Sequence, residues 1–136
     1  MVEGSCLCGD IRFAVDSDIE DLEYCHCSKC RKATGSAFGA FGFVPADRFR
    51  WKSGHELVRG YASSHDVERT FCTRCGATLQ WKHASRPDRF GIALGLVDGS
   101  PSIRPKAHIF LGSKAPWFEL DEGIPRYDEE PPEDQI

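Results

Sequence analysis

The seven cysteines of this chain lie in three short clusters, and this arrangement constrains the fold more than any other feature. The clusters are Cys6-Leu7-Cys8-Gly9, Cys25-His26-Cys27-Ser28-Lys29-Cys30 and Cys72-Thr73-Arg74-Cys75-Gly76. An odd number of cysteines, with nothing that marks the chain as secreted, argues against a disulfide framework. Closely spaced thiols are instead typical ligands of a soft metal ion such as zinc. Zinc takes four protein ligands at a structural site and three at a catalytic site, so seven cysteines fit one site of each kind.

The first and third clusters resemble each other, because each is followed at once by a glycine and then by strand-like sequence. A glycine at that position lets the backbone turn tightly, so that its N–H groups face the sulfurs. Free cysteines seldom cluster at ligand spacing, which argues against ordinary buried thiols. We therefore predict a structural zinc site that joins the start of the chain to its middle, held by Cys6, Cys8, Cys72 and Cys75.

The middle cluster differs, because Cys25, Cys27 and Cys30 lie within six residues and no glycine follows until Gly35. Three thiolates can hold one zinc and leave its fourth position to water or a thiol, where the ion acts as a Lewis acid. Two alternatives stay open from the spacing. One is a redox dithiol of Cys27 and Cys30, since C-x-x-C spacing favours a low thiol pKa. The other is a closed site completed by His26 or a distant histidine. The position of His26 between two ligands favours a side chain that points away, and surface or core positions are expected for His55, His65, His83 and His108.

The remainder of the sequence predicts a mostly β fold. Alternation of residue types predicts strands over 11–15 and 89–97, and strand-like sequence predicts others over 57–61, 67–71, 78–81 and 105–111. One helical turn is expected at Pro45–Arg48, and residues 31–42 are expected to form a glycine-rich loop where backbone approaches a site closely. Within 89–97, large apolar residues alternate with Gly91, Ala93 and Gly95, so one face nearly lacks side chains. Such a face suits close packing or the wall of a cavity.

The length of 136 residues suits one domain with a modest core. We place this domain at residues 1–127, with Pro116–Phe118 packed on the core, and expect the acidic, proline-rich residues 128–136 to be a disordered tail. The net charge of −4 gives no basic footprint for nucleic acid. No apolar run is long enough to span a membrane, and no secretory leader is evident, so a cytoplasmic protein is expected. The apolar stretch Phe38–Phe43 and Trp117 offer surface for a homodimer or for core packing.

Four stretches together resemble the glutathione-dependent formaldehyde-activating enzyme family, which also includes centromere protein V. They are Gly4–Gly9, Cys25–Phe38, Phe71–Gly76 and the late residues His108, Ile109, Ser113, Lys114 and Trp117. The resemblance implies a β-tent-like fold of small antiparallel sheets and two zinc sites. Its structural set is Cys6, Cys8, Cys72 and Cys75, and its catalytic set is Cys25, Cys27 and Cys30. The family reaction joins glutathione and formaldehyde to S-hydroxymethylglutathione. The enzymes behind the family name carry a helical C-terminal extension, so this chain resembles the short members.

Two classes of function follow from these observations. In the first, zinc on the middle cluster binds a small thiol, in particular glutathione, as its thiolate, for addition to a small electrophile such as an aldehyde. A metal is useful because a free thiol, with a pKa of about 8.5, is mostly protonated at neutral pH. Lys29, Arg31 and Lys32 either attract the carboxylates of glutathione or are simply solvated. In the second class the protein is a non-catalytic zinc-binding module or a thiol carrier.

Overall fold

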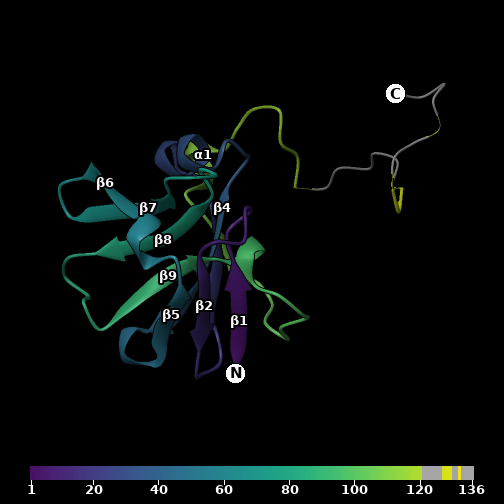
Figure 1. The fold of residues 1–136 in the computed structure, drawn as a ribbon. Helices are drawn as coiled ribbons and strands as arrows, with labels where there is room; N and C mark the ends of the chain where they lie inside the picture. Colours follow the sequence, from purple (N-terminus) through teal and green to yellow (C-terminus); the bar gives the residue numbers. More distant parts are fainter. Residues whose placement is uncertain (121–126, 130–131, 133–136) are drawn as a thin grey trace.

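The structure, a computed structural model, describes residues 1–120, 127–129 and 132 and contains two β-sheets (Figure 1). The smaller sheet is antiparallel and consists of β1 (Val2–Ser5), β2 (Arg12–Val15) and β5 (Phe49–Ser53). The larger sheet has, in spatial order, β10 (Ala107–Ile109), β3 (Glu20–Cys25), β4 (Gly39–Pro45), β9 (Arg89–Ala93), β8 (Thr78–His83), β7 (Val67–Cys72) and β6 (Val58–Ser64). The prediction of a mostly β fold is confirmed. Its strands pair antiparallel except β10, which pairs parallel with β3.

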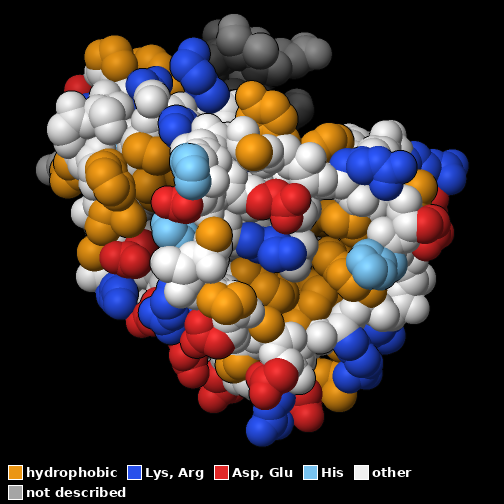
Figure 2. Space-filling model, turned by 90° about the vertical axis from the view of Figure 1, so that its left-hand side faces the viewer, with side chains coloured by type: hydrophobic (Ala, Val, Ile, Leu, Met, Phe, Trp, Pro, Cys, Tyr) orange, Lys and Arg blue, Asp and Glu red, His pale blue; other side chains and the backbone are white. Residues whose placement is uncertain are grey.

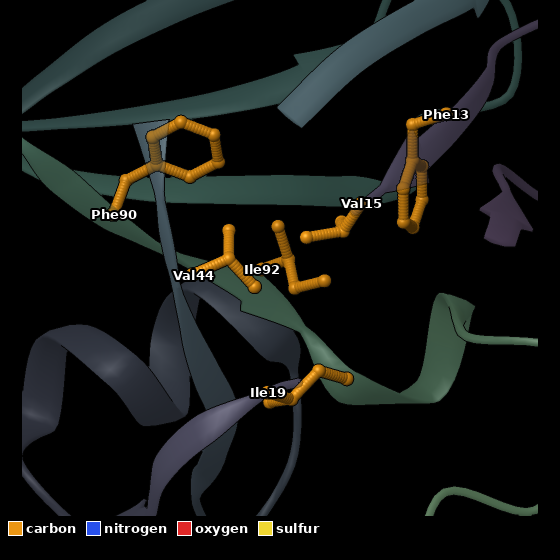
Figure 3. Packing of buried hydrophobic residues seen from close by; sticks show 6 residues of the cluster. All are labelled: Phe13, Val15, Ile19, Val44, Phe90 and Ile92. Atoms are coloured by element: carbon orange, nitrogen blue, oxygen red, sulfur yellow. The ribbon is translucent and has the colours of Figure 1, made fainter. Parts of the chain in front are cut away.

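The main core lies between the two sheets, and Figure 3 shows its buried side chains. They are Phe13, Val15, Ile19, Val44, Phe90 and Ile92. Residues two apart on one strand share a face of the sheet, which is why Phe90 and Ile92 of β9 both point inward. In Figure 3 the aliphatic side chains of Val15, Val44 and Ile92 lie between the rings of Phe90 and Phe13. This packing fixes which face of the larger sheet is left for a site.

The opposite face of the larger sheet carries a row of residues in register across four strands. Arg69 of β7 pairs with Trp81 of β8, Trp81 with Gly91 of β9, and Gly91 with Phe43 of β4. Ala93, two residues beyond Gly91, faces the same way. The nearly bare face predicted for the stretch 89–97 thus serves close packing, because Gly91 stands between Phe43 and Trp81, which line the cavity described below.

The cysteine-rich middle of the chain differs from the predicted loop, because residues Ser28–Thr34 form the helix α1. Its N-terminus is capped by Cys27, whose sulfur accepts a hydrogen bond of 3.4 Å from the backbone N–H of Cys30. Its C-terminus is set by Gly35, at a positive φ of 63°. Seven residues are too few to show the apolar period of an amphipathic helix, so the sequence pattern gave no indication of it.

Three further predictions are corrected or limited by the structure, and a fourth, the turn near Pro45, is confirmed. The stretch 89–97 is not one strand, because β9 ends at Ala93 and Leu94–Leu96 forms a 3₁₀ turn. The predicted turn near Pro45 is present as a 3₁₀ turn over Ala46–Arg48. Trp117 does not pack on the core, since 69% of it is exposed, whereas the neighbouring Phe118 ring lies 5.5 Å from that of His26. Most of the predicted tail, residues 128–136, lies outside the described residues.

On the face shown in Figure 2, lysine and arginine side chains lie among acidic ones, with apolar patches between them. No helix in the part of the chain that the structure describes is long and apolar enough to cross a membrane.

Candidate functional site

The first and third cysteine clusters meet where two chain turns lie side by side. Cys6 and Cys8 lie in the turn between β1 and β2, whereas Cys72 ends β7 and Cys75 precedes β8. Their four sulfurs lie within 4.8 Å of one another, and those of Cys6 and Cys8 are 3.5 Å apart. Zinc–sulfur bonds of about 2.3 Å place tetrahedral ligands about 3.8 Å apart, so this set of sulfurs fits one zinc ion. We call it the four-cysteine cluster.

Backbone N–H groups face the sulfurs of this cluster, as expected from the glycines that follow it. The N–H of Ile11 donates to Cys6 Sγ at 3.4 Å, and the N–H of Cys75 donates to Cys72 Sγ at 3.4 Å. Both turns depend on a glycine at positive φ, namely Gly9 at 82° and Gly76 at 79°. Such donors stabilise thiolates, and the left-handed backbone explains why glycine stands at both positions.

The middle cysteines form a second set, called here the three-cysteine cluster. Cys25 ends β3, Cys27 caps α1 and Cys30 lies in the first turn of that helix. Their three sulfurs also lie within 4.8 Å of one another, with Cys30 buried and the other two half-buried. The three thiols can therefore serve one metal ion, and they supply one ligand fewer than a closed tetrahedral zinc site requires.

His26 points away from the cysteines on either side of it. Its ring is fully buried, and its Nε2 lies 2.8 Å from Nδ1 of His108. His108 belongs to β10, the strand that pairs with β3. The ring of Phe38 lies 5.1 Å away on another side. Burial is the main reason that the pKa of His26 is lowered, and the His108 charge lowers it further. The structure gives no support to His26 as the fourth ligand of the three-cysteine cluster.

Arg69, which no motif of the sequence singles out, lies beside the three-cysteine cluster. Only 8% of this residue is exposed. Its Nη2 donates to Cys30 Sγ at 3.5 Å and its Nε donates to Ser63 Oγ at 3.0 Å, whereas Nη1 is buried without a partner among the described residues. The one sign in the sequence is that Arg69 shares a strand face with the apolar Val67, and an arginine on such a face is seldom buried unless it has a partner.

The protonation of the cysteines reflects this environment. A hydrogen bond from Cys25 is the largest cause that lowers the pKa of the Cys30 thiol, to about 5. Burial opposes this change, and the guanidinium of Arg69 adds to it. The pKa of Cys25 is raised by the same hydrogen bond and by burial. The hydrogen bond between the two sulfurs therefore favours the thiolate form of Cys30 and the thiol form of Cys25.

A pocket of about 390 Å³ opens beside the three-cysteine cluster. All three of its cysteines lie on the wall, together with Glu23, Lys29, Phe41, Phe43, Ser64, Val67, Arg69, Trp81, Ile109 and Phe110. Lys29 is thus placed at the site as a cation, but Arg31 and Lys32 do not line this pocket. Glu23, which the sequence did not single out, contributes a carboxylate. The arrangement can bring a small molecule against the sulfurs.

Comparison with known proteins agrees with this arrangement. The model of the family described as glutathione-dependent formaldehyde-activating enzyme matches residues 1–113. An uncharacterized lyase of Schizosaccharomyces pombe is 32% identical over 118 residues, which cover 87% of this chain and 84% of the relative. A Halomonas elongata relative, named as a candidate glutathione-dependent formaldehyde-activating enzyme, is 29% identical over 132 residues, which cover 89% of this chain and 82% of the relative.

The fold also occurs among solved structures. A crystal structure of a Rhodobacter sphaeroides protein superimposes on this chain with a TM-score of 0.61 and 21% sequence identity. The superposition covers 78% of this chain and 98% of the Rhodobacter sphaeroides protein. The match of the family model over most of the chain decides the assignment, because it includes all three cysteine clusters. The chain belongs to the glutathione-dependent formaldehyde-activating enzyme family.

Proposed function

We propose that this protein is a zinc-dependent enzyme of the carbon–sulfur lyase type that joins a small thiol, glutathione, to a small electrophile such as an aldehyde. The observation that carries the proposal is the pocket on whose wall Cys25, Cys27 and Cys30 lie. Three cysteine ligands leave the fourth coordination position of a zinc ion free, and a substrate sulfur can bind there. The four-cysteine cluster, which lines no part of this pocket, is assigned a structural zinc.

A zinc ion held by the three-cysteine cluster would stabilise a substrate thiolate at neutral pH. The bond changes are then simple. The sulfur electron pair forms the new S–C bond, the π pair of the carbonyl moves onto oxygen, and the proton from the thiol ends on that oxygen. No oxidant or reductant is required. In the reverse direction the S–C bond breaks and the carbonyl is restored.

The residues around the cluster have separate roles in this proposal. Arg69 donates a hydrogen bond to Cys30, and the positive charge of its guanidinium offsets part of the negative charge of the thiolates. Glu23 is the carboxylate on the pocket wall, and we assign it the transfer of the thiol proton. Lys29 is exposed at the rim, where its charge suits a carboxylate of glutathione.

The test is the zinc content of protein purified without chelator, measured by elemental analysis before and after addition of glutathione. We expect two zinc ions per chain before addition. Glutathione, which binds at the open position, should make the ion of the three-cysteine cluster the more readily exchanged of the two, so that the zinc content falls toward one when the protein is then separated from free zinc. Cys25, Cys27 and Cys30 should become open to alkylation at the same time, whereas Cys72 should stay protected.

Other outcomes would point to the alternatives. Two zinc ions that glutathione leaves undisturbed, with no thiol adduct formed from any aldehyde, would favour a non-catalytic module with two closed sites. One zinc throughout, with reversible oxidation confined to Cys27 and Cys30, would favour a redox dithiol instead. Either result would contradict the proposed enzyme.

A further inference from the structure

One wall of the pocket consists of aromatic side chains that pack around a glycine of the neighbouring strand. Phe41 and Phe43 lie two apart on β4 and share the face of the sheet that carries Trp81. Gly91 stands between Phe43 and Trp81 in the register. A Cβ atom added at Gly91 would lie 3.1 Å from Cβ of Phe41, so the absence of a side chain there lets the aromatic residues approach one another.

This wall is held in shape before any ligand arrives. The rings of Phe43 and Trp81 meet edge to face, with centroids 5.8 Å apart and planes at 82°. The guanidinium of Arg89 covers the Phe43 ring at 4.5 Å. At the other end, a Cβ atom at Gly39 would lie 2.8 Å from the Phe41 ring and 3.3 Å from Cβ of Cys30. The apolar wall therefore continues up to the three-cysteine cluster.

An apolar wall next to the sulfurs matters for the choice of electrophile. Formaldehyde has no substituent that could contact rings, and a pocket of about 390 Å³ is far larger than it needs. Glutathione is polar and carries two carboxylates, so it gains little from Phe41, Phe43 and Trp81. Its charged groups suit the polar rim at Lys29 instead. The substituent of the second substrate is then the group left to cover the wall.

We propose that the electrophile is an aldehyde with an aromatic or similarly bulky apolar substituent, seated against Phe41, Phe43 and Trp81 with its carbonyl carbon toward the three-cysteine cluster. The inference rests on the proposed function. Val67, the first residue of β7, lines the pocket and limits the room available for that substituent. Arg69, on the same strand face, lies between Val67 and the cluster and is suited to the polar end of the substrate.

The test measures binding as well as turnover, on the zinc-loaded full chain. Calorimetry compares S-benzylglutathione with S-methylglutathione, which share the tripeptide and differ in the apolar group. The benzyl compound should bind at least about tenfold more tightly, because it alone reaches the rings. In turnover, kcat/KM with glutathione should be at least about tenfold higher for phenylacetaldehyde than for formaldehyde.

Two variants of one hairpin make the comparison specific. Val67→Phe fills the pocket and should remove both tenfold preferences. Ala62→Phe adds a similar ring to an exposed position that pairs with Glu68 and so lies on the opposite face of the same hairpin, and it should leave both preferences intact. Circular dichroism of both variants checks that the fold is kept.

The outcomes separate this inference from the function on which it rests. Equal binding of the two thioethers, together with turnover of formaldehyde that matches or exceeds that of phenylacetaldehyde, overturns the apolar substrate and leaves the enzyme proposal standing. A preference for the benzyl group that Val67→Phe does not change also overturns it, since the ring then binds elsewhere. No binding of either compound and no turnover of either aldehyde would overturn the proposed function itself.

Discussion

Nη2 of Arg69 lies 3.5 Å from Sγ of Cys30, and this contact joins two residues 39 positions apart in the sequence. It connects the middle strand of the β6–β7–β8 meander to the first turn of α1. The guanidinium is held at its other end by Ser63 Oγ. A buried cation next to a thiol stabilises the thiolate form, so the contact links the position of a strand to the chemistry of the cluster.

The first prediction concerns the ionisation of this thiol in metal-free protein. In Arg69→Met the pKa of Cys30 should move up from about 5 toward the ordinary 9.0, because a group that stabilises the thiolate is lost. The wild-type thiolate should persist as the pH falls to about 5, whereas the variant should lose it at a higher pH. The thiolate ultraviolet absorbance, titrated with acid, measures the change.

Arg59→Met serves as the control, because Arg59 is exposed on β6 and touches no cysteine among its described contacts. It should leave the titration as in the wild type. A titration of Arg69→Met that overlays the wild type would show that Arg69 does not set the ionisation.

The sequence sufficed for the parts of the site that are local. Spacing alone separated Cys25, Cys27 and Cys30 from the other four cysteines, and the glycines at positions 9 and 76 indicated how the two remaining clusters turn. Alternation in 89–97 indicated a bare strand face, because side-chain direction in a strand follows from a period of two.

The parts that the sequence did not reveal depend on strand order. Arg69 reaches Cys30 only because β7, β8, β9 and β4 lie side by side, and no local pattern encodes that order. The hydrogen bond between His26 and His108 spans 82 residues and requires the parallel pairing of β10 with β3. The predicted packing of Trp117 on the core is wrong, because apolar composition alone does not decide which of two neighbouring aromatic residues faces inward.

The second prediction follows from the buried His26. Burial lowers its pKa below the ordinary 6.5, so folding favours the neutral ring. Its stabilising contribution is complete above pH 6.5 and is lost as the pH falls below that value toward the folded pKa. The free energy of unfolding from urea titrations should therefore decline in this range for the wild type, and less steeply for His26→Phe.

His65→Phe is the matched control, because the side chain of His65 is 96% exposed. It should keep the wild-type dependence on pH. Equal slopes for wild type and His26→Phe would mean that other groups, rather than His26, cause the decline.

The third prediction tests the contact between β5 and the loop that leads from the first cysteines. Gly54 has a φ of 76°, and a Cβ atom there would lie 2.3 Å from the carbonyl oxygen of Asp10. Gly99 has nearly the same φ, 79°, with nothing within 4 Å. Gly99→Ala should thus cost about 1 kcal/mol of stability from the left-handed backbone alone. Gly54→Ala should cost about 2 kcal/mol more, because the backbone clash adds to that strain. Similar losses in urea unfolding would rule out the clash as a cause.

The last prediction distinguishes the roles of the two cysteine clusters. Cys72, a member of the four-cysteine cluster, is fully buried and packs with Ile11 and Leu79. In Cys72→Ser we expect one zinc to be lost and the melting temperature to fall by about 10 °C or more, because the bound ion contributes directly to folding. In Cys27→Ser we expect one zinc and the turnover to be lost while the melting temperature changes by less than about 3 °C.

The second substitution is mild for the fold because serine is itself a favoured N-cap, so α1 keeps a hydrogen-bond acceptor where the sulfur of Cys27 stood. The comparison uses elemental analysis and thermal unfolding of both variants, each purified from medium with the same zinc concentration. If the two variants lost the same stability, the ion of the three-cysteine cluster would stabilise the fold as much as that of the four-cysteine cluster, and the assignment of the structural role to the four-cysteine cluster alone would be wrong. A large loss confined to Cys72→Ser would place stability in one cluster and chemistry in the other.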